Sequence, residues 1–430
     1  MWQPDEIVVT KEAIDETVTR RILARCPGVP VRVAGTSLPR DIRGASHILS
    51  CAADLAERIA AGKHVLVLVP TTNSVVGEFE MADPRIGCPH FPKLVTVSNG
   101  CPFRCTWCFL KGTYRGLFPF MAVHVRYDRI MKKILRLVGK ASTPIIFNMG
   151  ELQDGLALEH VTGAAQILIP FFGQLPNGYL FLLTKSTNVE PILALPHNGH
   201  AVLAWSLNAP EISREFEIGA PPFEQRLAAA RRAQEAGYPI RVRLDPIVPL
   251  PGWQRLYVDT IERIFTEIAP QRITLGTLRF EEEFYEKRKA LVGQEETGLH
   301  LLSEMNRMAP MLPPMLVPTG KRGKDGRPRM KTSVGKYSYP QDLRVEIFRF
   351  AISEIRKRFD GPIALCKETV DVWHAVGLDP RRCACVCQFE EADLLRRATG
   401  ADHTLPEQGD EARVNEGGAG TAAADNDQKT

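Results

Sequence analysis

The chain has 430 residues, a formal net charge of +4 and 44% hydrophobic residues, a composition typical of a soluble enzyme. No stretch approaches the roughly 20 uninterrupted apolar residues of a membrane-spanning helix, and the acidic start MWQPDEIVVTKEAIDE is unlike a signal peptide. These features exclude a membrane protein, and we expect a cytoplasmic protein of two or three domains.

Residues 1–92 are predicted to form a small N-terminal α/β region. An apolar run at 7–9, helical stretches near 13–24 and 55–61, and the strand-like run HVLVLVP at 64–70 support this assignment.

From about residue 94, short apolar runs alternate with amphipathic helical stretches. The predicted strands are 94–98, 144–148, 179–184, 201–207, 239–245 and 272–276. This alternation predicts a parallel sheet, because parallel neighbours need a crossover connection. We predict a partial (β/α)6 TIM-like barrel over residues 93–360, with a complete eight-stranded barrel or a doubly wound sheet as alternatives.

The last part of the chain changes in composition. A Pro-, Gly- and Lys/Arg-rich segment at 310–340 is predicted to be a loop, and a long helix is expected at about 341–359. The apolar run PIALC is expected to open a cysteine-rich extension at 361–400. Residues 401–430 are predicted to be a disordered acidic tail, so the rest of the chain carries a larger positive surplus than +4. That surplus permits a polyanionic partner without identifying one.

Ten cysteines in a chain of this kind indicate thiolate ligands more than disulfides, because the cytosol keeps thiols reduced. Cys26 and Cys51 stand alone and are expected to be small core residues. The others gather mainly in two groups, within 101–108 and within 383–387.

The first group lies in VSNGCPFRCTWCFLKG, after the first predicted barrel strand. Cys101, Cys105 and Cys108 have the spacing Cys-x3-Cys-x2-Cys and can bind three irons of a [4Fe–4S] cluster, which leaves the fourth iron without a protein ligand. That iron can chelate the amino and carboxylate groups of S-adenosylmethionine, so that one electron breaks a carbon–sulfur bond. The alternative is a zinc site with Cys88 as fourth ligand.

This motif, with the aromatic Trp107 before its last cysteine, resembles that of the radical S-adenosylmethionine superfamily. The resemblance implies a place near the adenine for Trp107. It also implies that Glu151, at the end of the segment FNMGE, contacts the amino group of the cofactor. The family has a glycine where this chain has Met149, so the match is partial. The alternative for Glu151 is a surface carboxylate at a strand end.

Within that superfamily, the chain resembles the spore photoproduct lyase family from residue 4 to about 339. The fragments that carry the resemblance are PDEIVV near the start, FLLTKS at 181–186, WSLN at 205–208, FEIGAPPFEQRLAAARRAQEAGY at 216–238, PGW at 251–253 and GKYSY at 335–339. The resemblance implies a DNA-repair lyase that splits a methylene-linked thymine dimer through an adenosyl radical. It further implies that Lys185 and Ser206 contact S-adenosylmethionine, and that a flavodoxin or ferredoxin supplies one electron.

Two departures concern the hydrogen atom that must return to the product. The family has a cysteine where this chain has Glu151, and a tyrosine where it has Phe109. A carboxylate does not readily donate a hydrogen atom, and a phenyl ring has no O–H. The candidate donors that remain are Tyr114, Tyr337, Tyr339 and Cys88, of which the two tyrosines of GKYSY are our predicted catalytic residues.

The segment KRGKDGRPRMKTSVGK at 321–336 has seven basic residues and one acid, Asp325. The basic residues are Lys321, Arg322, Lys324, Arg327, Arg329, Lys331 and Lys336. Beside the tyrosines of GKYSY, they could contact phosphates while an extruded base stacks on a ring, so DNA is the predicted partner. The alternative is a solvated charged loop.

The second cysteine group offers four thiols, enough for a second iron–sulfur cluster or a structural zinc. They are Cys366, Cys383, Cys385 and Cys387. The alternative is a set of free thiols, because alternate residues of an extended strand point the same way and cannot wrap a metal. Two other functions remain open: a radical enzyme of this scaffold that acts on another nucleotide or a peptide, and a non-enzymatic zinc- and nucleic-acid-binding protein.

Overall fold

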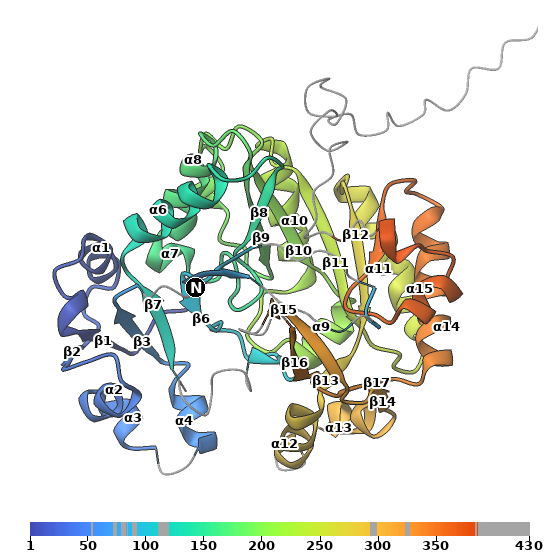
Figure 1. Ribbon diagram of the computed structural model, residues 1–430, viewed down its shortest axis with the longest axis horizontal. Helices are drawn as coiled ribbons and strands as arrows, with labels where there is room; N and C mark the ends of the chain where they lie inside the picture. The colour runs from blue at the N-terminus through green and yellow to red at the C-terminus, as the bar shows by residue number, and fades with distance from the viewer. Residues whose placement is uncertain are drawn as a thin grey trace, which may run out of the picture.

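The computed structural model describes residues 1–52, 55–71, 75–78, 83, 85–87, 93–110, 120–292, 299–322, 327–382 and 385. Most of the described strands belong to two sheets that adjoin (Figure 1). The N-terminal sheet lies at the left of the view, the second sheet in the middle, and the C-terminal helices α14 (Gln341–Arg356) and α15 (Val370–Ala375) at the right.

The N-terminal sheet has the strand order β2-β1-β3-β7-β6. Its strands are β1 (Glu6–Thr10), β2 (Val31–Ala34), β3 (Val65–Val69), β6 (Ser98–Asn99) and β7 (Met121–His124). Its helices are η1 (Lys11–Ala13), α1 (Thr17–Arg25), α2 (Pro39–Ala45), α3 (His47–Ser50) and α4 (Leu55–Ala61). All of β3 is buried, as expected for a parallel strand covered on both faces. Since β6 and β7 belong to this sheet, the N-terminal unit extends past residue 92.

The second sheet is the predicted parallel barrel sheet, with the order β18-β12-β11-β10-β9-β8-β5-β4. Its strands are β4 (Val76–Glu78), β5 (Lys93–Val95), β8 (Ile145–Asn148), β9 (Gly178–Thr184), β10 (Ala201–Ser206), β11 (Ile240–Ile247), β12 (Ile273–Thr277) and β18 (Ile363–Leu365). All pairs are parallel except β4 with β5. The sheet curls into a half-barrel. The curl brings Lys367, after β18, close enough to bond with Glu151, after β8, across the mouth at the carboxyl ends of the strands.

Helices connect these strands as the alternating sequence predicts. They are α6 (Tyr127–Val138), α7 (Glu159–Thr162), α8 (Ala164–Phe172), η3 (Glu190–Ile192), α9 (Pro210–Phe216), α10 (Phe223–Glu235) and α11 (Trp253–Glu267). The end of α10 was expected at Gly237, which has a φ of +85° that favours glycine. The next amide, on Tyr238, bonds with the carbonyl of Ala233, which closes the helix end.

The segment predicted as a loop at 310–340 forms strands instead. The strands β13 (Arg279–Glu281), β14 (Ala309–Leu312) and β17 (Lys336–Ser338) make an antiparallel sheet, and β15 (Leu316–Arg322) pairs with β16 (Pro328–Thr332) as a hairpin. The nearby helices are α12 (Glu282–Val292), α13 (Leu299–Asn306) and η5 (Pro380–Arg382). Proline and charged residues obscured these strands, because antiparallel strands with exposed faces carry few apolar residues.

Strand β18 corrects a second expectation. The run PIALC pairs with β12 inside the barrel sheet, so the barrel continues past residue 360, where a separate extension was expected. Its three residues are all buried, which explains why the run is uninterrupted by polar residues. In the described part of the chain, no helix has both the length and the apolar character that crossing a bilayer needs.

Candidate active site at the barrel mouth

The cysteine loop is fixed to the barrel mouth by its backbone. The amide of Gly100 donates to the carbonyl of Leu152 (2.9 Å), and the amide of Thr106 donates to the carbonyl of Phe216 (2.7 Å). The φ of Gly100 is +84°, a conformation that side chains with a Cβ rarely adopt. The loop follows β6 rather than the barrel strand β5 directly, so it lies where the two sheets meet.

The three thiols of this loop are sheltered. Cys101 and Cys105 are 9% and 7% exposed, and Cys108 is half-buried. Burial raises the pKa of Cys105 to about 12, although Lys185 opposes the rise. Burial, followed by the charge of Asp154, raises the pKa of Cys101 well above its usual value, and Cys105 and Cys108 contribute to the rise. The sulfurs of Cys105 and Cys108 are therefore close enough to Cys101 to disfavour its ionisation.

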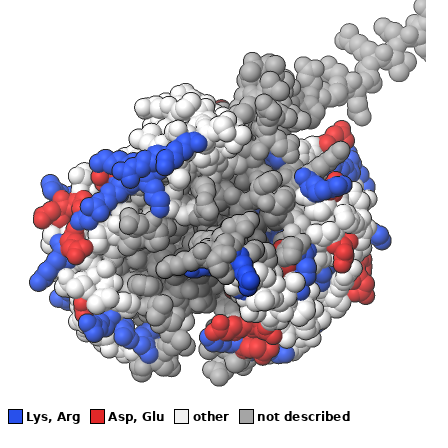
Figure 2. Space-filling view, in the orientation of Figure 1, with Lys and Arg blue, Asp and Glu red and all other residues white. Residues whose placement is uncertain are grey.

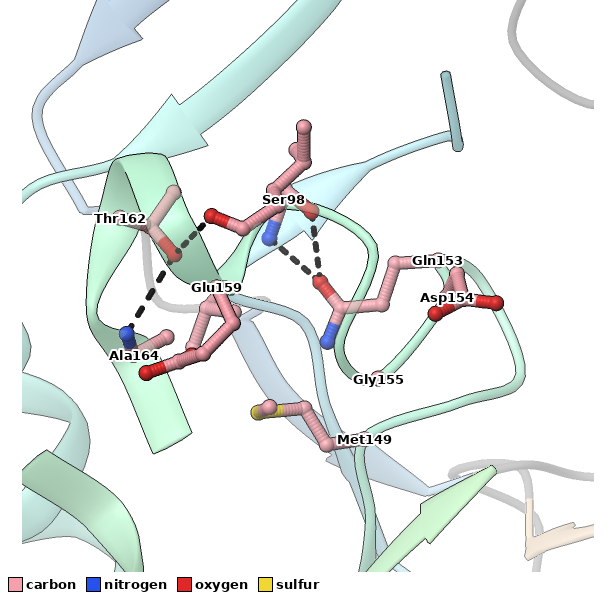
Figure 3. Close-up of a pocket in the computed structure, with 10 residues that line it drawn as sticks. Ser98, Met149, Gln153, Asp154, Gly155, Glu159, Thr162 and Ala164 are labelled. Atoms are coloured by element: carbon pink, nitrogen blue, oxygen red, sulfur yellow. Dashed lines mark hydrogen bonds between the residues drawn. The ribbon is translucent and has the colours of Figure 1, made fainter. Parts of the chain in front are cut away.

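A small cavity lies behind the loop (Figure 3). Gln153 reaches toward Ser98, whose amide and hydroxyl donate to its Oε1 at 2.6 and 2.8 Å. The neighbouring Asp154 accepts from Thr184 Oγ1 (2.6 Å) and from the amide of Lys185 (2.8 Å). These bonds tie the segment after β8 to the cysteine loop on one side and to the end of β9 on the other.

Trp107 lies in the same loop and is largely buried. Its ring stacks on Phe216 of α9 with a centroid distance of 4.9 Å and an interplanar angle of 30°. Arg288 of α12 donates to the carbonyl of Thr106 (3.0 Å), and Lys63 donates to the carbonyls of Cys101 and Phe103. The loop is thus held by Lys63 of the N-terminal unit and by residues of α9 and α12.

A first set of charged groups adjoins Cys105, and we call Lys185, Ser206, Glu217 and Arg226 the cysteine-side network. The ammonium of Lys185 donates to Ser206 Oγ (2.9 Å) and lies 3.5 Å from Glu217 Oε1. Glu217 also pairs with Arg226 through its second oxygen. Burial alone would lower the pKa of Lys185, but Glu217 and Cys105 outweigh it and raise that pKa. Lys185 is therefore cationic beside the thiols.

A second set lies at the ends of β11, β12, β18 and β8. We call Glu151, Arg243, Asp245, Arg279 and Lys367 the far-side network. Asp245 Oδ2 accepts from Arg243 (2.6 Å) and from Arg279 (2.9 Å), and these cations hold its pKa well below the usual range despite burial. Lys367 Nζ donates to Glu151 Oε1 (2.6 Å).

The far-side network reaches the cysteine loop. Lys367 Nζ lies 5.8 Å from the ring centroid of Phe109, the residue that follows Cys108. Arg243 also donates to the sulfur of Cys366 (2.8 Å). Glu151, predicted to contact the cofactor, is therefore already paired with a cation, and its role stays a prediction.

Sequence reasoning assigned no role to Glu217 or Arg226, although both lie in the fragment 216–238 that carries the family resemblance. On the far side it named only Glu151, and Lys367 belongs to no recognised motif. A usable signal on the far side was RVRLD at 241–245, in which alternate positions place Arg243 and Asp245 on the same face of a strand that ends at the mouth.

The two tyrosines predicted as hydrogen donors lie on or beside β17. Tyr339 is fully buried, and its hydroxyl donates to Glu304 Oε2 (2.7 Å). Tyr337 is half-buried and stacks on Tyr285 with a centroid distance of 4.2 Å. Their catalytic roles stay predictions. Tyr114 and Cys88 lie outside the described residues.

The basic segment divides between the hairpin and β17. Arg327, Arg329 and Lys331 are exposed on or beside β16, and Lys336 begins β17. Lys321 and Arg322 fall in β15, but their side chains are outside the described residues, as is all of Lys324. The hairpin thus presents at least three exposed cations together.

The second cysteine group is described only in part. Cys383 and Cys387 lie outside the described residues. Cys366 and Cys385 are both buried, and Thr274 Oγ1 lies 3.4 Å from the sulfur of Cys385. The second metal site therefore stays a prediction. Of the two isolated cysteines, Cys26 is buried as expected, but Cys51 is exposed, so its assignment to the core was wrong.

Comparisons with known proteins identify the family of this chain. The model of the spore photoproduct lyase family matches residues 2–296. The chain belongs to the spore photoproduct lyase family. It is therefore a radical S-adenosylmethionine enzyme of the lyase type, with a [4Fe–4S] cluster and S-adenosylmethionine as cofactors, and not a non-enzymatic zinc protein.

Individual relatives agree in sequence. The spore photoproduct lyase of Clostridium acetobutylicum is 23% identical over 357 residues, which cover 82% of this chain and 96% of that protein. The enzyme of Geobacillus sp. is 30% identical over 190 residues, or 44% of this chain and 54% of that protein. A solved spore photoproduct lyase with dinucleoside spore photoproduct has a TM-score of 0.67 at 20% identity, covering 85% of this chain and 99% of its own. That likeness shows the shared fold.

The residues of the cysteine loop fit the cluster of this family. Thiols as buried as Cys101 and Cys105 stay protonated unless a metal takes the place of the proton. Within the described ranges, no three His, Cys, Asp or Glu side chains converge as one metal ion would require. A cubane makes a different demand, because each thiolate binds its own iron. Lys185 and Arg226 also lower the pKa of Cys105, as cations beside a thiolate do.

Proposed function

We propose that this chain splits spore photoproduct in DNA, with Cys101, Cys105 and Cys108 as the cluster ligands. The observation that carries the proposal is the placement of three sheltered thiols at the mouth of a parallel half-barrel, beside the half-buried Lys185. Reactive groups of such sheets gather at the carboxyl ends of the strands, where the loops converge.

The cluster and S-adenosylmethionine, when bound, supply the radical that removes a hydrogen atom from the lesion. The chain's own residues bind and orient. Lys185 and Ser206, 2.9 Å apart, offer a cation and a hydroxyl to the carboxylate of the cofactor. Glu217 holds Lys185 in its charged form, and Trp107 with Phe216 forms an aromatic wall that suits an adenine.

The hairpin β15–β16 is the proposed DNA contact. Arg329 and Lys331 are exposed on it, beside the exposed apolar Leu316 (61%) and Met330 (48%). Cations can bind phosphates while apolar side chains enter between bases and unstack them. Figure 2 shows further Lys and Arg side chains gathered at the upper left, where Figure 1 places α6. A duplex thus has basic surface beyond the mouth itself.

A second substrate is favoured by one specific observation. Glu151 stands where the family has its donor cysteine, and it is paired with Lys367. An enzyme without that thiol could act on another modified nucleotide and consume S-adenosylmethionine instead of regenerating it. The two functions differ in what accumulates, because a returned hydrogen atom leaves no net 5′-deoxyadenosine.

One assay separates them. The reduced protein is incubated anaerobically with S-adenosylmethionine and DNA that contains spore photoproduct, and thymine restoration and 5′-deoxyadenosine are measured together. We expect restored thymine with little 5′-deoxyadenosine. Steady 5′-deoxyadenosine production with the lesion intact would favour the second substrate class.

We also propose a cytoplasmic location and a flavodoxin or ferredoxin as electron donor, since the cluster must be reduced by one electron. A second cluster or zinc on Cys366, Cys383, Cys385 and Cys387 remains a separate proposal. Iron, sulfide and zinc analysis of the reconstituted protein tests it. Four irons per chain and no zinc would contradict a second metal site, whereas eight irons, or four with one zinc, would support it.

A further inference from the structure

Lys336 faces the barrel mouth from the sheet β13–β17–β14. In the ladder between β13 and β17, Lys336 lies opposite Glu281, and Arg279 lies opposite Ser338. Residues opposite one another and residues two apart share a face of an antiparallel sheet. That face looks toward the barrel, because Ser338 Oγ lies 3.3 Å from Thr277 Oγ1, at the end of β12. Lys336 and Arg279 are therefore diagonal neighbours beside the mouth.

Lys336 has no bound counter-charge within the described ranges. No described side chain forms a hydrogen bond or ion pair with its ammonium group, although the residue is half-buried. Burial, followed by repulsion from Lys367 and Arg279, lowers its pKa to about 8. The exposed Glu281 opposes this shift, and so does Asp83, which is itself paired with Arg85. The free protein thus holds Lys336 in a site unfavourable for its charge.

The whole group has a surplus of positive charge. The cations are Arg243, Arg279, Lys336 and Lys367, and the buried carboxylates among them are Asp245 and Glu151. Partial exposure matters here: the side chains of Arg243, Arg279 and Lys367 are 16%, 16% and 20% exposed. A group of excess cations that are only partly desolvated attracts an anion from solvent.

The cofactor does not require this surplus, because its carboxylate has partners on the other side of the mouth. Lys185 and Ser206 lie at the ends of β9 and β10, next to Cys105. The far-side network comes from β11, from β13 and from the residues that follow β8 and β18, with Lys336 beside it. The anion that suits the far side therefore belongs to the substrate.

We propose that the far-side network and Lys336 form a binding site for a phosphate of the nucleic-acid substrate. The inference rests on the proposed function for the identity of the ligand, and it adds a subsite inside the mouth to the contacts on the hairpin. Two guanidinium and two ammonium groups match a phosphate through charge-assisted hydrogen bonds.

The first test uses inorganic phosphate as the probe and needs no lesion. Isothermal titration calorimetry compares the wild-type holoenzyme with Lys336→Met, which keeps the length of the side chain but removes its charge. Lys357→Met, at an exposed position after α14, is the matched control. We expect Lys336→Met to weaken phosphate binding about tenfold, as for one charge-assisted hydrogen bond, and the control to change nothing. Equal affinity in all three proteins would overturn the site.

The second test asks which anion the site serves. Two lesions are compared, spore photoproduct with and without its internucleotide phosphate. We expect the wild type to have the lower KM for the phosphate-containing lesion, and Lys336→Met to lose that preference while its KM for S-adenosylmethionine is unchanged. A raised KM for S-adenosylmethionine in Lys336→Met would overturn the assignment to the substrate.

The two proposals can fail separately. If both lesions are cleaved with the same KM by the wild type, the phosphate site falls and the proposed function stands. If neither lesion is cleaved but phosphate binding still depends on Lys336, the proposed function falls and the anion site stands.

Discussion

The carboxylate–guanidinium pairs of the two charge networks at the barrel mouth differ in how far water reaches them. On the cysteine side, the paired side chains of Glu217 and Arg226 are 1% and 0% exposed, although that of Lys185 is 19% exposed. On the far side, the side chain of Asp245 is nearly as buried, but the cations around it keep contact with solvent. This difference in exposure indicates which side binds a resident cofactor and which side binds a ligand that exchanges with solvent. A fully buried and balanced ion pair such as Glu217–Arg226 suits the site of a resident cofactor, whereas partly solvated cations in excess suit a ligand that comes and goes.

The largest effect is expected from removal of one cluster ligand. We expect Cys105→Ala to lose bound iron and all lesion cleavage, because a cubane held by two thiolates on one loop is not retained. Cys51→Ala, at an exposed cysteine, should retain both. Iron analysis and far-UV circular dichroism of the two variants test this. Full iron content in Cys105→Ala would contradict the assignment.

Removal of the Glu217 carboxylate tests whether water is excluded from its pair with Arg226. Glu217→Gln keeps the size of the side chain but leaves Arg226 buried without its counter-charge. We expect the free energy of unfolding to fall by about 3 kcal/mol. Glu224→Gln, which breaks the exposed pair with Arg263, should cost less than about 1 kcal/mol. Urea unfolding of both apoproteins measures the difference, and similar losses would mean that water reaches Glu217.

The fold was predictable from sequence to the extent that its signals are local. All six predicted barrel strands occur, because strands covered on both faces are unbroken apolar runs, as in β9 and β10. The cysteine loop is also a local motif. The strands of 310–340 were missed, because their alternation is interrupted by prolines and charged residues.

The charge networks could not be predicted in the same way. Glu151 and Lys367 are 216 residues apart, and only the curl of the sheet brings them together. Arg226 belongs to α10, and its pairing with Glu217 depends on how that helix packs on the barrel. An ion pair that depends on tertiary packing leaves no periodic trace in a single sequence.

Lys185→Met tests whether the cysteine-side network binds S-adenosylmethionine. The variant should retain its cluster but raise the KM for S-adenosylmethionine about tenfold or more, because one charge-assisted bond to the carboxylate is lost. Its KM for the lesion should change little. Lys185→Arg, which keeps the charge, should recover part of the affinity. A change in the KM for the lesion alone would place Lys185 with the substrate instead.

The pH dependence of phosphate binding tests the role of Lys336 beside the far-side network. The pKa of Lys336 is lowered to about 8 by burial and by Lys367 and Arg279, against Glu281 and Asp83. An anion binds the charged lysine, so affinity should be full below pH 7 and fall as pH rises through about 8. A dinucleotide with one phosphodiester is the probe, because its charge is constant over this range. Lys336→Arg should remove the pH dependence, since a guanidinium stays charged. A fall that persists in Lys336→Arg would assign the titration to another group.

The smallest effect is expected outside the mouth, on the hairpin. Arg329 is exposed, so its contact with a phosphate is screened by salt. Arg329→Ala should weaken binding of any duplex alike and reduce the slope of log K against log[salt] by about 0.9. Lys357→Ala, outside the proposed contacts, should leave the slope unchanged. If Arg329→Ala instead weakened only the binding of lesion-containing DNA, the hairpin would recognise the lesion. The distinction between non-specific DNA binding at the hairpin and a specific phosphate site in the mouth would then be lost.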